Sequence, residues 1–365
     1  MMIKEIKFTD NAIKHINAIL SKKDHGIFFR IAIKGGGCSG FQYDFSFDKE
    51  AQKDDLVQNN ILIDKTSADL LKGSEIDYVK ELIGDSFKIN NPQSKSSCGC
   101  GVSFSVWMII SSWNVNSVRA RIDNIKEYLK KFSPDIMMMQ EIKTPNETYP
   151  YDDLKSLNYE NYVFGQKSYN GVAIVSKKKL NNIQNDIFKD KNKQSRLISA
   201  DVKLKKKNIY LINIYTPNGN PVDTEKYTYK LYWLDSLIKK LKSLLKQNEN
   251  IIIGGDFNII PSAEDVHNPK GYENDALFRL EIRKKLREII NLGFHDAYRY
   301  IYPEKEGYTF WDYTSGAWQK NNGMRIDHFL VSNSLIGNVK NVNINKYPRG
   351  KQKPSDHTPI ELELA

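Results

Sequence analysis

The chain has 365 residues, 40% of them hydrophobic, and a formal net charge of +10 at pH 7. This length is enough for two well-filled cores, and no apolar run approaches the roughly 20 residues that cross a bilayer. The N-terminus, MMIKEIKFTD, lacks the apolar centre of a signal peptide, so we expect a cytoplasmic protein with no membrane partner. An odd count of three cysteines indicates a metal site or inert thiols rather than a disulfide framework.

The excess positive charge lies in the second part of the chain. Residues 1–107 contain 14 Lys and Arg against 14 Asp and Glu, whereas residues 108–365 contain 40 against 30. Such a balance suits a polyanionic partner such as nucleic acid. However, 44 of the 54 basic residues are Lys, and a Lys-rich composition can also reflect the base composition of the gene. Charge alone therefore does not decide the partner.

The first part of the chain begins with an amphipathic pattern followed by two strand patterns. Residues 8–23, FTDNAIKHINAILSKK, predict a helix after the capping candidates Thr9 and Asp10. Its apolar face consists of Ala12, Ile16, Ile19 and Leu20. Residues 27–33, IFFRIAI, predict a strand, and FQYDFSFD, which follows a glycine-rich turn, predicts a second strand. Four aromatic residues are expected on one face of that second strand: Phe41, Tyr43, Phe45 and Phe47.

The three cysteines occupy glycine-rich segments. Cys38 lies in the turn GGGCSG, and Cys98 and Cys100 lie in the polar tail NPQSKSSCGCG. Three thiolates form a soft, all-sulfur ligand set that suits an iron–sulfur cluster or, less well, zinc. Three ligands leave a coordination position open, and a second protomer could fill it, which would give a homodimer. The alternative is three unrelated thiols.

The stretches GGGCSGFQYDFSF and CGCGVSFSV resemble those of the A-type iron–sulfur carrier family, whose members receive clusters and pass them to apo-enzymes. The resemblance covers residues 3–106 and implies a small β-rich carrier domain over residues 1–107. It further implies a cluster bound by Cys38, Cys98 and Cys100, oligomerisation through the cluster, and apo iron–sulfur proteins as partners. Whether an iron–sulfur cluster or mononuclear iron is the working ligand stays open.

From Met108 onward, strand and helix patterns alternate. Residues 117–132 predict a helix with one buried stripe, and WLDSLIKKLKSLLKQ predicts a second helix. The predicted strands are MIISSWNV, DIMMMQE, GVAIVS, RLISADVKL, NIYLINIY and ENIIIGGDFN. An α/β sandwich fits this alternation best.

Several polar residues fall at the ends of these predicted strands, and two more lie near the C-terminus. The first group is Asn114, Asn116, Glu141, Tyr215, Asp256 and Asn258, and the second is Asp356 and His357. Each alone is more commonly a turn or cap residue, but together they form an oxygen-rich set with one imidazole. Such a set suits Mg²⁺ or Mn²⁺ rather than zinc. A hard cation and a carboxylate that activates water are the groups that phosphodiester hydrolysis requires.

His357 needs a carboxylate partner if it is to act as an imidazolium at neutral pH. Asp327, in GMRIDHFLVS, is the candidate for this partner. Asp356 is adjacent to His357 in sequence, so its side chain is expected to point elsewhere, towards the metal.

Eight stretches resemble, in order, the motifs of the exonuclease III family of abasic-site endonucleases. They are WNVNSVRARI, QEIK, GVAIVSK, INIYTPNG, GGDFNIIP, YTFWDYTSGAW, GMRIDHFLVS and KPSDHTPIELEL. The resemblance spans residues 108–365 and implies a four-layered α/β sandwich, the endonuclease/exonuclease/phosphatase fold. It also implies the following roles: Glu141 and Asp356 as metal ligands with Asn116 nearby, Asn114 and Asn258 beside the phosphate, Tyr215 as a cleft phenol, Asp256 as the water-activating base, and Asp327 orienting His357.

The wider superfamily also contains lipid and inositol phosphatases, so the substrate needs separate evidence. An abasic nucleotide lacks its base, and a small apolar pocket can select it because a normal flipped-out base would overfill the pocket. Phe310, Met324 and Ile326 match the family's pocket positions; the alternative is ordinary core packing. Four basic residues near the predicted strand ends are candidate phosphate-backbone contacts: Arg119, Arg121, Lys143 and Lys167.

The sequence therefore predicts a Mg²⁺-dependent abasic-site endonuclease and 3′–5′ exodeoxyribonuclease of base excision repair, fused to an iron–sulfur cluster binding domain. Its expected substrate is double-stranded DNA with abasic sites or blocked 3′ ends. The first alternative is an iron–sulfur carrier with the nuclease domain as a passenger. An inositol- or lipid-phosphate phosphatase is disfavoured by the pocket motif and the basic charge. The junction SVW-MII has no spacer and only Trp107 is spare, which fits either tethered domains or two merged genes.

Overall fold

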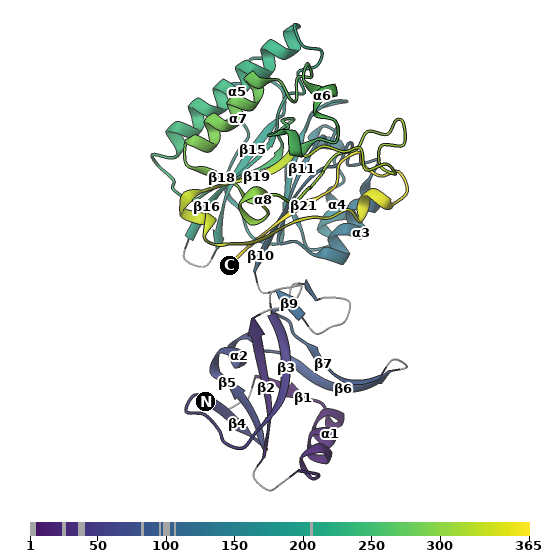
Figure 1. Ribbon diagram of the computed structural model, residues 1–365, viewed down its shortest axis with the longest axis vertical. Coiled ribbons are helices and arrows are strands. Elements are labelled where there is room, and N and C mark those ends of the chain that lie inside the picture. The colour runs from purple at the N-terminus through teal and green to yellow at the C-terminus, as the bar shows by residue number, and fades with distance from the viewer. Residues whose placement is uncertain are drawn as a thin grey trace. The chain divides into compact units, whose positions relative to one another are not determined.

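The computed structural model describes residues 5–23, 27–35, 41–81, 84–94, 96–97, 103–105, 107–204 and 207–365. The chain divides into two compact units, Met1–Trp107 and Met108–Ala365 (Figure 1). The three predicted cluster ligands, Cys38, Cys98 and Cys100, lie outside the described residues. Among the helices that the structure describes, none is long and apolar enough to cross a membrane.

The first unit is rich in β-structure. Its strands are β1 (Lys7–Phe8), β2 (Phe28–Gly35), β3 (Phe41–Asp48), β4 (Asp55–Gln58), β5 (Ile61–Asp64), β6 (Glu75–Glu81), β7 (Gly84–Asn90), β8 (Ser96–Ser97) and β9 (Ser103–Ser105). Its helices are α1 (Asp10–Leu20) and α2 (Lys65–Leu70). Six strands form a sheet in the order β4-β5-β2-β3-β9-β8, and three form a sheet in the order β1-β6-β7. This is the small β-rich domain expected from the sequence.

Helix α1 and strand β3 follow the sequence patterns with one difference. Thr9 caps α1, because its Oγ1 accepts a hydrogen bond from the backbone N–H of Ala12 at 3.2 Å. Strand β3 pairs with β2 in antiparallel register, and Tyr43 is buried in the core of the unit. The predicted aromatic row weakens along the strand, since Phe47 is 39% exposed.

The second unit contains two six-stranded sheets. The first has the order β12-β13-β11-β10-β21-β20 and the second β14-β15-β16-β17-β19-β18. The strands of the first are β10 (Met108–Asn114), β11 (Ile136–Gln140), β12 (Glu160–Phe164), β13 (Val172–Ser176), β20 (Val339–Ile344) and β21 (Ile360–Leu364). Those of the second are β14 (Asn181–Gln184), β15 (Leu197–Leu204), β16 (Lys207–Tyr215), β17 (Ile251–Asp256), β18 (Phe294–Asp296) and β19 (Asp327–Ser332). The helices are α3 (Ile122–Phe132), α4 (Tyr151–Lys155), α5 (Glu225–Leu244), α6 (Pro269–Tyr272), α7 (Leu280–Asn291), α8 (Ala297–Ile301) and α9 (Asn333–Ile336), with 3₁₀ turns η1 (Asn146–Thr148), η2 (Ala263–Asp265) and η3 (Pro348–Gly350).

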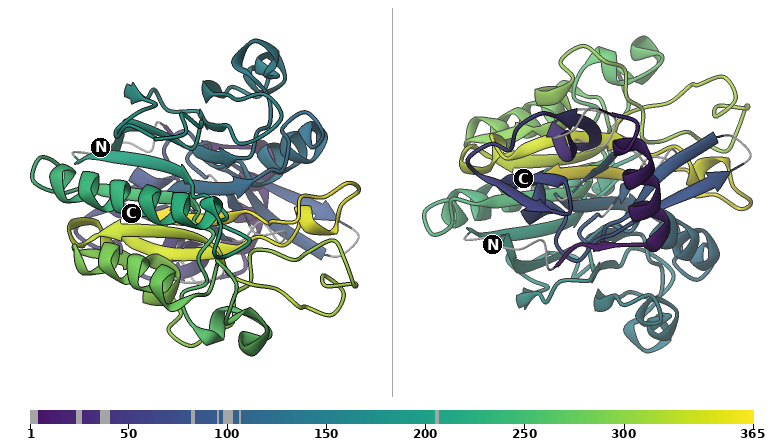
Figure 2. Two further views of the ribbon diagram at one scale, coloured as in Figure 1. Left: turned by 90° about the horizontal axis from the view of Figure 1, so that it is seen from above. Right: turned by 90° about the horizontal axis from the view of Figure 1, so that it is seen from below.

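Alternating strand residues divide the apolar side chains of this unit among three layers of core. In β11, Met137 and Met139 pack with α3, whereas Met138 packs between the two sheets. In β17, Ile252 also lies between the sheets, whereas Ile253 packs against α5 and α7. The order helix, sheet, sheet, helix is the four-layered α/β sandwich predicted from the sequence. Helices α5 and α7 lie side by side in Figure 1, and Figure 2 shows the long α5 from two further directions.

The first helix of this unit starts later than its apolar stripe predicts. The sequence predicts a helix over residues 117–132, but α3 begins at Ile122. Asn116 and Ser117 have positive φ angles of 45° and 87°, which right-handed helices exclude. The Arg121 guanidinium donates a hydrogen bond to the Asn116 carbonyl and fixes this turn at the exit of β10.

Candidate active site

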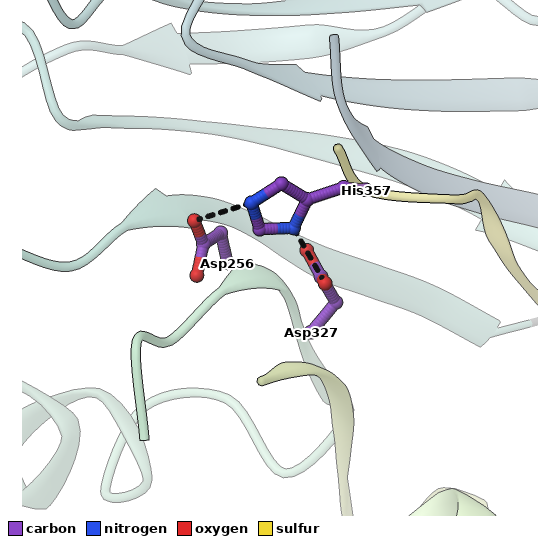
Figure 3. A group of neighbouring side chains, drawn as sticks. All are labelled: Asp256, Asp327 and His357. Carbon is purple, nitrogen blue, oxygen red and sulfur yellow. Dashed lines mark hydrogen bonds and ion pairs between the residues drawn. The ribbon is translucent and has the colours of Figure 1, made fainter. Parts of the chain in front are cut away.

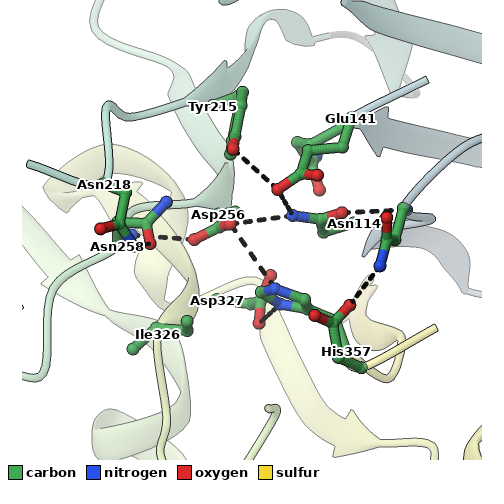
Figure 4. A network of polar contacts seen from close by, with 12 residues as sticks. Asn114, Glu141, Tyr215, Asn218, Asp256, Asn258, Ile326, Asp327 and His357 are labelled. Carbon is green, nitrogen blue, oxygen red and sulfur yellow. Dashed lines mark hydrogen bonds and ion pairs between the residues drawn. The ribbon is translucent and has the colours of Figure 1, made fainter. Parts of the chain in front are cut away.

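The predicted site residues come together because the strands that carry them end at the same edges of the two sheets. β10 pairs with β11 in parallel, so Asn114 lies opposite Gln140 and near Glu141. β16 pairs with β17 in parallel, which aligns Tyr215 with Asp256. Figure 4 shows the polar contacts that link residues from both sheets.

Three residues of this region have backbone conformations that side-chain-bearing residues rarely adopt. The φ angles are 45° for Asn116, 51° for Glu141 and 48° for Asn258. Each lies one or two residues beyond the end of a strand, where the left-handed conformation turns the chain sharply. Such conformations cost on the order of 1 kcal/mol or more and are found preferentially at functional sites.

A carboxylate, an imidazole and a second carboxylate form the buried centre of the region (Figure 3). His357 Nδ1 lies 2.8 Å from Asp327 Oδ2, and His357 Nε2 lies 3.8 Å from Asp256 Oδ2. Burial lowers the pKa of His357, but the charges of Asp327 and Asp256 outweigh it and raise the pKa above its ordinary value. Burial raises the pKa of Asp256, an effect that the positive charge of His357 opposes. One ligand atom from each lies within 4.8 Å of the others, so this trio could also hold a metal ion.

Asn114 connects Glu141 to Asp256, and Tyr215 contacts Glu141. Asn114 Nδ2 donates hydrogen bonds to Glu141 Oε1 and Asp256 Oδ2, both at 3.0 Å. The Tyr215 hydroxyl donates to Glu141 Oε1 at 2.7 Å. Burial and the neighbouring charge of Glu141 raise the pKa of Tyr215 well above its ordinary value, so its phenol stays a neutral donor.

The predicted metal ligands are joined by an ammonium group. Lys143 Nζ lies 2.7 Å from Glu141 Oε2 and donates to Asn116 Oδ1 at 2.7 Å. Asn116 Nδ2 in turn donates to Asp356 Oδ1 at 3.1 Å. Burial would raise the pKa of Glu141, but Lys143 lowers it below its ordinary value. Because one ammonium bridges oxygens of Glu141 and Asn116, the predicted metal ligands form a set of oxygens that fits a cation. Carboxylate and amide oxygens are the ligands that Mg²⁺ and Mn²⁺ prefer.

Asn258 and a residue that the sequence reasoning missed, Asn218, complete the network. The Asn258 backbone N–H donates to Asp256 Oδ1 at 2.8 Å, and its Nδ2 donates to the Thr216 carbonyl at 3.0 Å. Asn218 Nδ2 donates to Asn258 Oδ1 at 3.1 Å. The signal for Asn218 was present, because the TPNG stretch that contains it follows β16 directly.

Of the three predicted pocket residues, Phe310 pairs with Met324 and packs against His357. Phe310 and Met324 exchange backbone hydrogen bonds at 3.0 Å, and the Phe310 ring packs edge-on against His357 with a centroid distance of 4.9 Å. Phe310 is half-buried, whereas Met324 and Ile326 are buried within the core that contains α5 and α7.

Two of the four predicted phosphate-backbone contacts, Arg119 and Lys167, are exposed. The other two are engaged within the protein. The Arg121 guanidinium donates to the Tyr313 hydroxyl at 3.1 Å, and Lys143 pairs with Glu141.

The two facing sheets and the acidic, asparagine-rich cluster at their strand exits define an α/β sandwich equipped for hydrolysis with a divalent cation. Residues 111–357 match the sequence model of the Endonuclease/Exonuclease/phosphatase family, and the chain belongs to this family. An exodeoxyribonuclease of Bacillus subtilis is 33% identical over 259 residues, which cover 70% of this chain and 98% of that protein.

Two solved structures show the same fold. An AP endonuclease from Archaeoglobus fulgidus is 34% identical with a TM-score of 0.67, covering 70% of this chain and 99% of that one. The 3′ phosphatase NExo from Neisseria, bound to a product DNA hairpin, is 31% identical with a TM-score of 0.67, covering 71% of this chain and 99% of that one. The remaining part of the chain also has a match, since residues 4–102 fit the family model described as iron-sulphur cluster biosynthesis. The predicted fusion of these two kinds of domain is confirmed.

Proposed function

We propose that the second unit, residues 108–365, is a Mg²⁺- or Mn²⁺-dependent phosphodiester hydrolase that cleaves DNA at abasic sites and removes 3′-terminal groups or nucleotides. The observation that carries the proposal is the continuous network in which Asn114 joins Glu141 to Asp256, and Asp256 faces His357. This network supports a candidate cation site beside a base and an imidazolium.

Each residue has a role that its contacts support. Glu141, Asp356 and Asn116 would hold the cation, which when bound supplies positive charge to the leaving oxygen. Asp256 accepts the proton of the attacking water, and its position is fixed by hydrogen bonds from Asn114 and the Asn258 backbone. The remaining groups that contact the phosphate are donors: Asn258, Tyr215 and protonated His357.

The proposed substrate is double-stranded DNA that contains an abasic site or a blocked 3′ end. Phe310, which packs against His357, and the nearby Met324 and Ile326 are apolar, so we expect them to line a pocket that admits a sugar without a base and excludes a normal nucleotide. The excess of basic residues in this unit suits the DNA backbone. The relatives include an AP endonuclease and a 3′ phosphatase bound to DNA, which supports both activities.

For the first unit, residues 1–107, we propose an iron–sulfur cluster or iron bound by Cys38, Cys98 and Cys100, with a homodimer sharing the cluster and apo iron–sulfur proteins as recipients. The support is the match to the iron-sulphur cluster biosynthesis family. Anaerobic reconstitution tests it: iron and sulfide should give a brown protein, and Cys→Ser changes should abolish the colour.

The test of the hydrolase is cleavage of a labelled duplex with one stable abasic analogue, with Mg²⁺ and with chelator. We expect metal-dependent nicking 5′ to the lesion that Asp256→Asn reduces by at least about 100-fold, the scale of losing a general base. Asp312→Asn, at a largely exposed carboxylate that caps a local turn, is the matched control and should cleave normally. If folded wild-type protein does not nick the duplex, the carrier function becomes the leading one.

A further inference from the structure

A lysine side chain is completely buried in the second unit. Lys230 lies in α5 and is 0% exposed. A buried ammonium is costly unless all of its protons are hydrogen-bonded. Burial lowers the pKa of Lys230, and the charges of Asp256 and Asp275 oppose this effect. The hydrogen bonds that offset this cost therefore show what Lys230 holds together.

The three protons of Lys230 reach three different segments of the chain. Nζ donates to the Asn218 carbonyl at 2.9 Å, to the Asn258 carbonyl at 2.6 Å and to the Ala276 carbonyl at 2.9 Å. The first segment follows β16, the second follows β17, and the third precedes α7. One ammonium thus joins two strand exits of the candidate site to a loop outside it.

Two of these segments carry the asparagines of the candidate site. Asn258 has a φ angle of 48°, and its backbone N–H bonds to Asp256 Oδ1. Asn218 and Asn258 are also joined through their side chains. Lys230 donates to the backbone carbonyls of both residues. It therefore contacts their backbone, whereas their side chains belong to the hydrogen-bond network of the candidate site.

Glycine packing keeps this lysine in place. Gly219 has a φ angle of 90°, and a Cβ there would lie 2.7 Å from Lys230 Cδ. The absence of a side chain at residue 219 lets the segment after β16 close over the lysine stem. The ammonium is therefore held by its three hydrogen bonds, and the absence of a side chain at residue 219 leaves room for the lysine stem.

We propose that Lys230 is a positioning residue of the hydrolase: its buried ammonium holds the Asn258 segment in the orientation in which Asn258 contacts the scissile phosphate. The inference rests on the proposed function. It differs from a general contribution to stability because it assigns the effect of Lys230 to one residue, Asn258.

The test compares Lys230→Met with a matched variant in the full chain. Asn220→Ala is the match, because Asn220 joins the first and third segments through hydrogen bonds at 3.1 Å to Asp275 and to the Ala276 N–H, without contacting Asn258. We expect Lys230→Met to lower kcat by about 10- to 100-fold, the scale of a small misplacement of a reacting group, with KM changed by less than about threefold. Asn220→Ala should retain kcat.

A double-mutant cycle decides whether the effect passes through Asn258. If it does, Lys230→Met combined with Asn258→Ala has the kcat of Asn258→Ala alone. A double variant whose loss of kcat equals the product of the two single losses would overturn the proposal. Steady-state kinetics on the abasic duplex, at a temperature where circular dichroism shows each variant folded, gives these values.

Amide hydrogen exchange provides a readout that does not depend on cleavage. Phe257, Asn258 and Ile260 have hydrogen-bonded N–H groups, bound to Ile326 O, Asp256 Oδ1 and Leu277 O. Peptides covering 257–262 should exchange faster in Lys230→Met and not in Asn220→Ala. Equal exchange in both variants would overturn the proposal. A wild-type protein that does not cleave DNA would instead overturn the proposed function, and the exchange data would still decide whether Lys230 positions Asn258.

Discussion

At the scale of single residues, two carboxylates on opposite sides of one imidazole set the charge of the site. Asp327 contacts Nδ1 of His357 and Asp256 faces Nε2, and together they raise the pKa of His357. The pKa of Asp256 is also raised, chiefly by burial. The proposed mechanism requires a protonated imidazole and an ionised Asp256, so we expect both limbs of a pH–rate profile to report on the ionisation of these three residues.

We expect Asp327→Asn to shift the alkaline limb of the pH–rate profile to lower pH. Asp327 is the largest influence that raises the pKa of His357, so its removal leaves the lowering effect of burial opposed only by Asp256 and Asp356. The imidazolium is then lost at a lower pH than in the wild type, and the cleavage rate at pH 8 falls more than the rate at pH 6. Rates measured from pH 5 to pH 10 at saturating metal test this.

On the acid side, the rate should rise with pH as Asp256 loses its proton, with a midpoint above the ordinary aspartate pKa of about 3.9. Asp186→Asn, at an exposed carboxylate, is the control and should leave both limbs in place. An Asp327→Asn profile that is lowered uniformly at every pH would show that Asp327 does not control the charge of His357.

At the scale of elements, apolar runs predicted most strands, whereas the turns between them were less predictable. The runs IIIGGD and IMMMQ became β17 and β11 because every residue in them is buried on one side or the other of a sheet. The start of α3 was misjudged, because the left-handed turn at Asn116 and Ser117 depends on the Arg121 contact rather than on the apolar stripe.

The same limit applies to the candidate site. The residues at its strand ends could be predicted from their position in the sequence. The groups that Lys143 and Lys230 contact could not. Lys143 was expected to contact DNA and pairs with Glu141. Lys230 stands three residues after Tyr227 and four before Leu234 on the buried stripe of α5, a signal that went unused. Only the carbonyls of distant loops explain why a charge is tolerated there.

The turn η2 is tied to the pocket segment by a buried ion-pair network. Arg325 Nε donates to Asp265 Oδ1 at 2.7 Å, and its Nη1 donates to Asp296 at 2.8 Å. Because Arg325 stands between Met324 and Ile326, the network holds the proposed pocket wall. Burial would raise the pKa of Asp265, but Arg325 lowers it to about 2.

We expect Asp265→Asn to reduce the free energy of unfolding by about 1–3 kcal/mol at pH 7, because the buried guanidinium of Arg325 loses one of its two carboxylate partners and keeps only Asp296. Since the folded pKa of Asp265 is lowered, its contribution is present above the ordinary pKa near 4 and is lost as the pH falls towards 2. Urea unfolding followed by tryptophan fluorescence at pH 7 and pH 3 measures this. Equal stability of variant and wild type at pH 7 would contradict it.

The spacing between the two sheets depends on a glycine in β17. A Cβ at Gly254 would lie 2.5 Å from Phe329 Cε1 and 2.8 Å from Met138 Sδ. We expect Gly254→Ala to destabilise the second unit by about 1–3 kcal/mol, the usual cost of overpacking a core. Gly337→Ala is the control, because a Cβ at residue 337 has no neighbour within 4 Å. The difference in urea midpoint between the two variants tests the prediction.

At the scale of the whole molecule, the second unit carries its own core and the whole candidate site. Every residue in the three large hydrophobic clusters of that unit comes from residue 108 or later. The Bacillus subtilis exodeoxyribonuclease aligns with this part over 98% of its length. We expect residues 108–365, expressed alone, to cleave the abasic duplex with a kcat/KM within about threefold of that of the full chain. The reason is that all residues proposed to bind DNA or to take part in the reaction lie in this part. A larger loss would mean that the first unit contributes to the reaction.

The covalent link between the units leads to a last prediction, that cluster loading does not change the nuclease rate. The proposed hydrolysis transfers a proton and needs no electron, so the redox state of a cluster bound by Cys38, Cys98 and Cys100 has no step to act on. We expect equal nicking rates, measured anaerobically, for the reconstituted chain, the cluster-free chain and a variant with all three cysteines changed to Ser. Absorbance of the bound cluster confirms loading in the first sample and its loss in the third. The opposite result would be a nicking rate that changes with cluster content, with the Ser variant cleaving at the rate of the cluster-free chain. The first unit would then be a cluster-dependent regulator of the second.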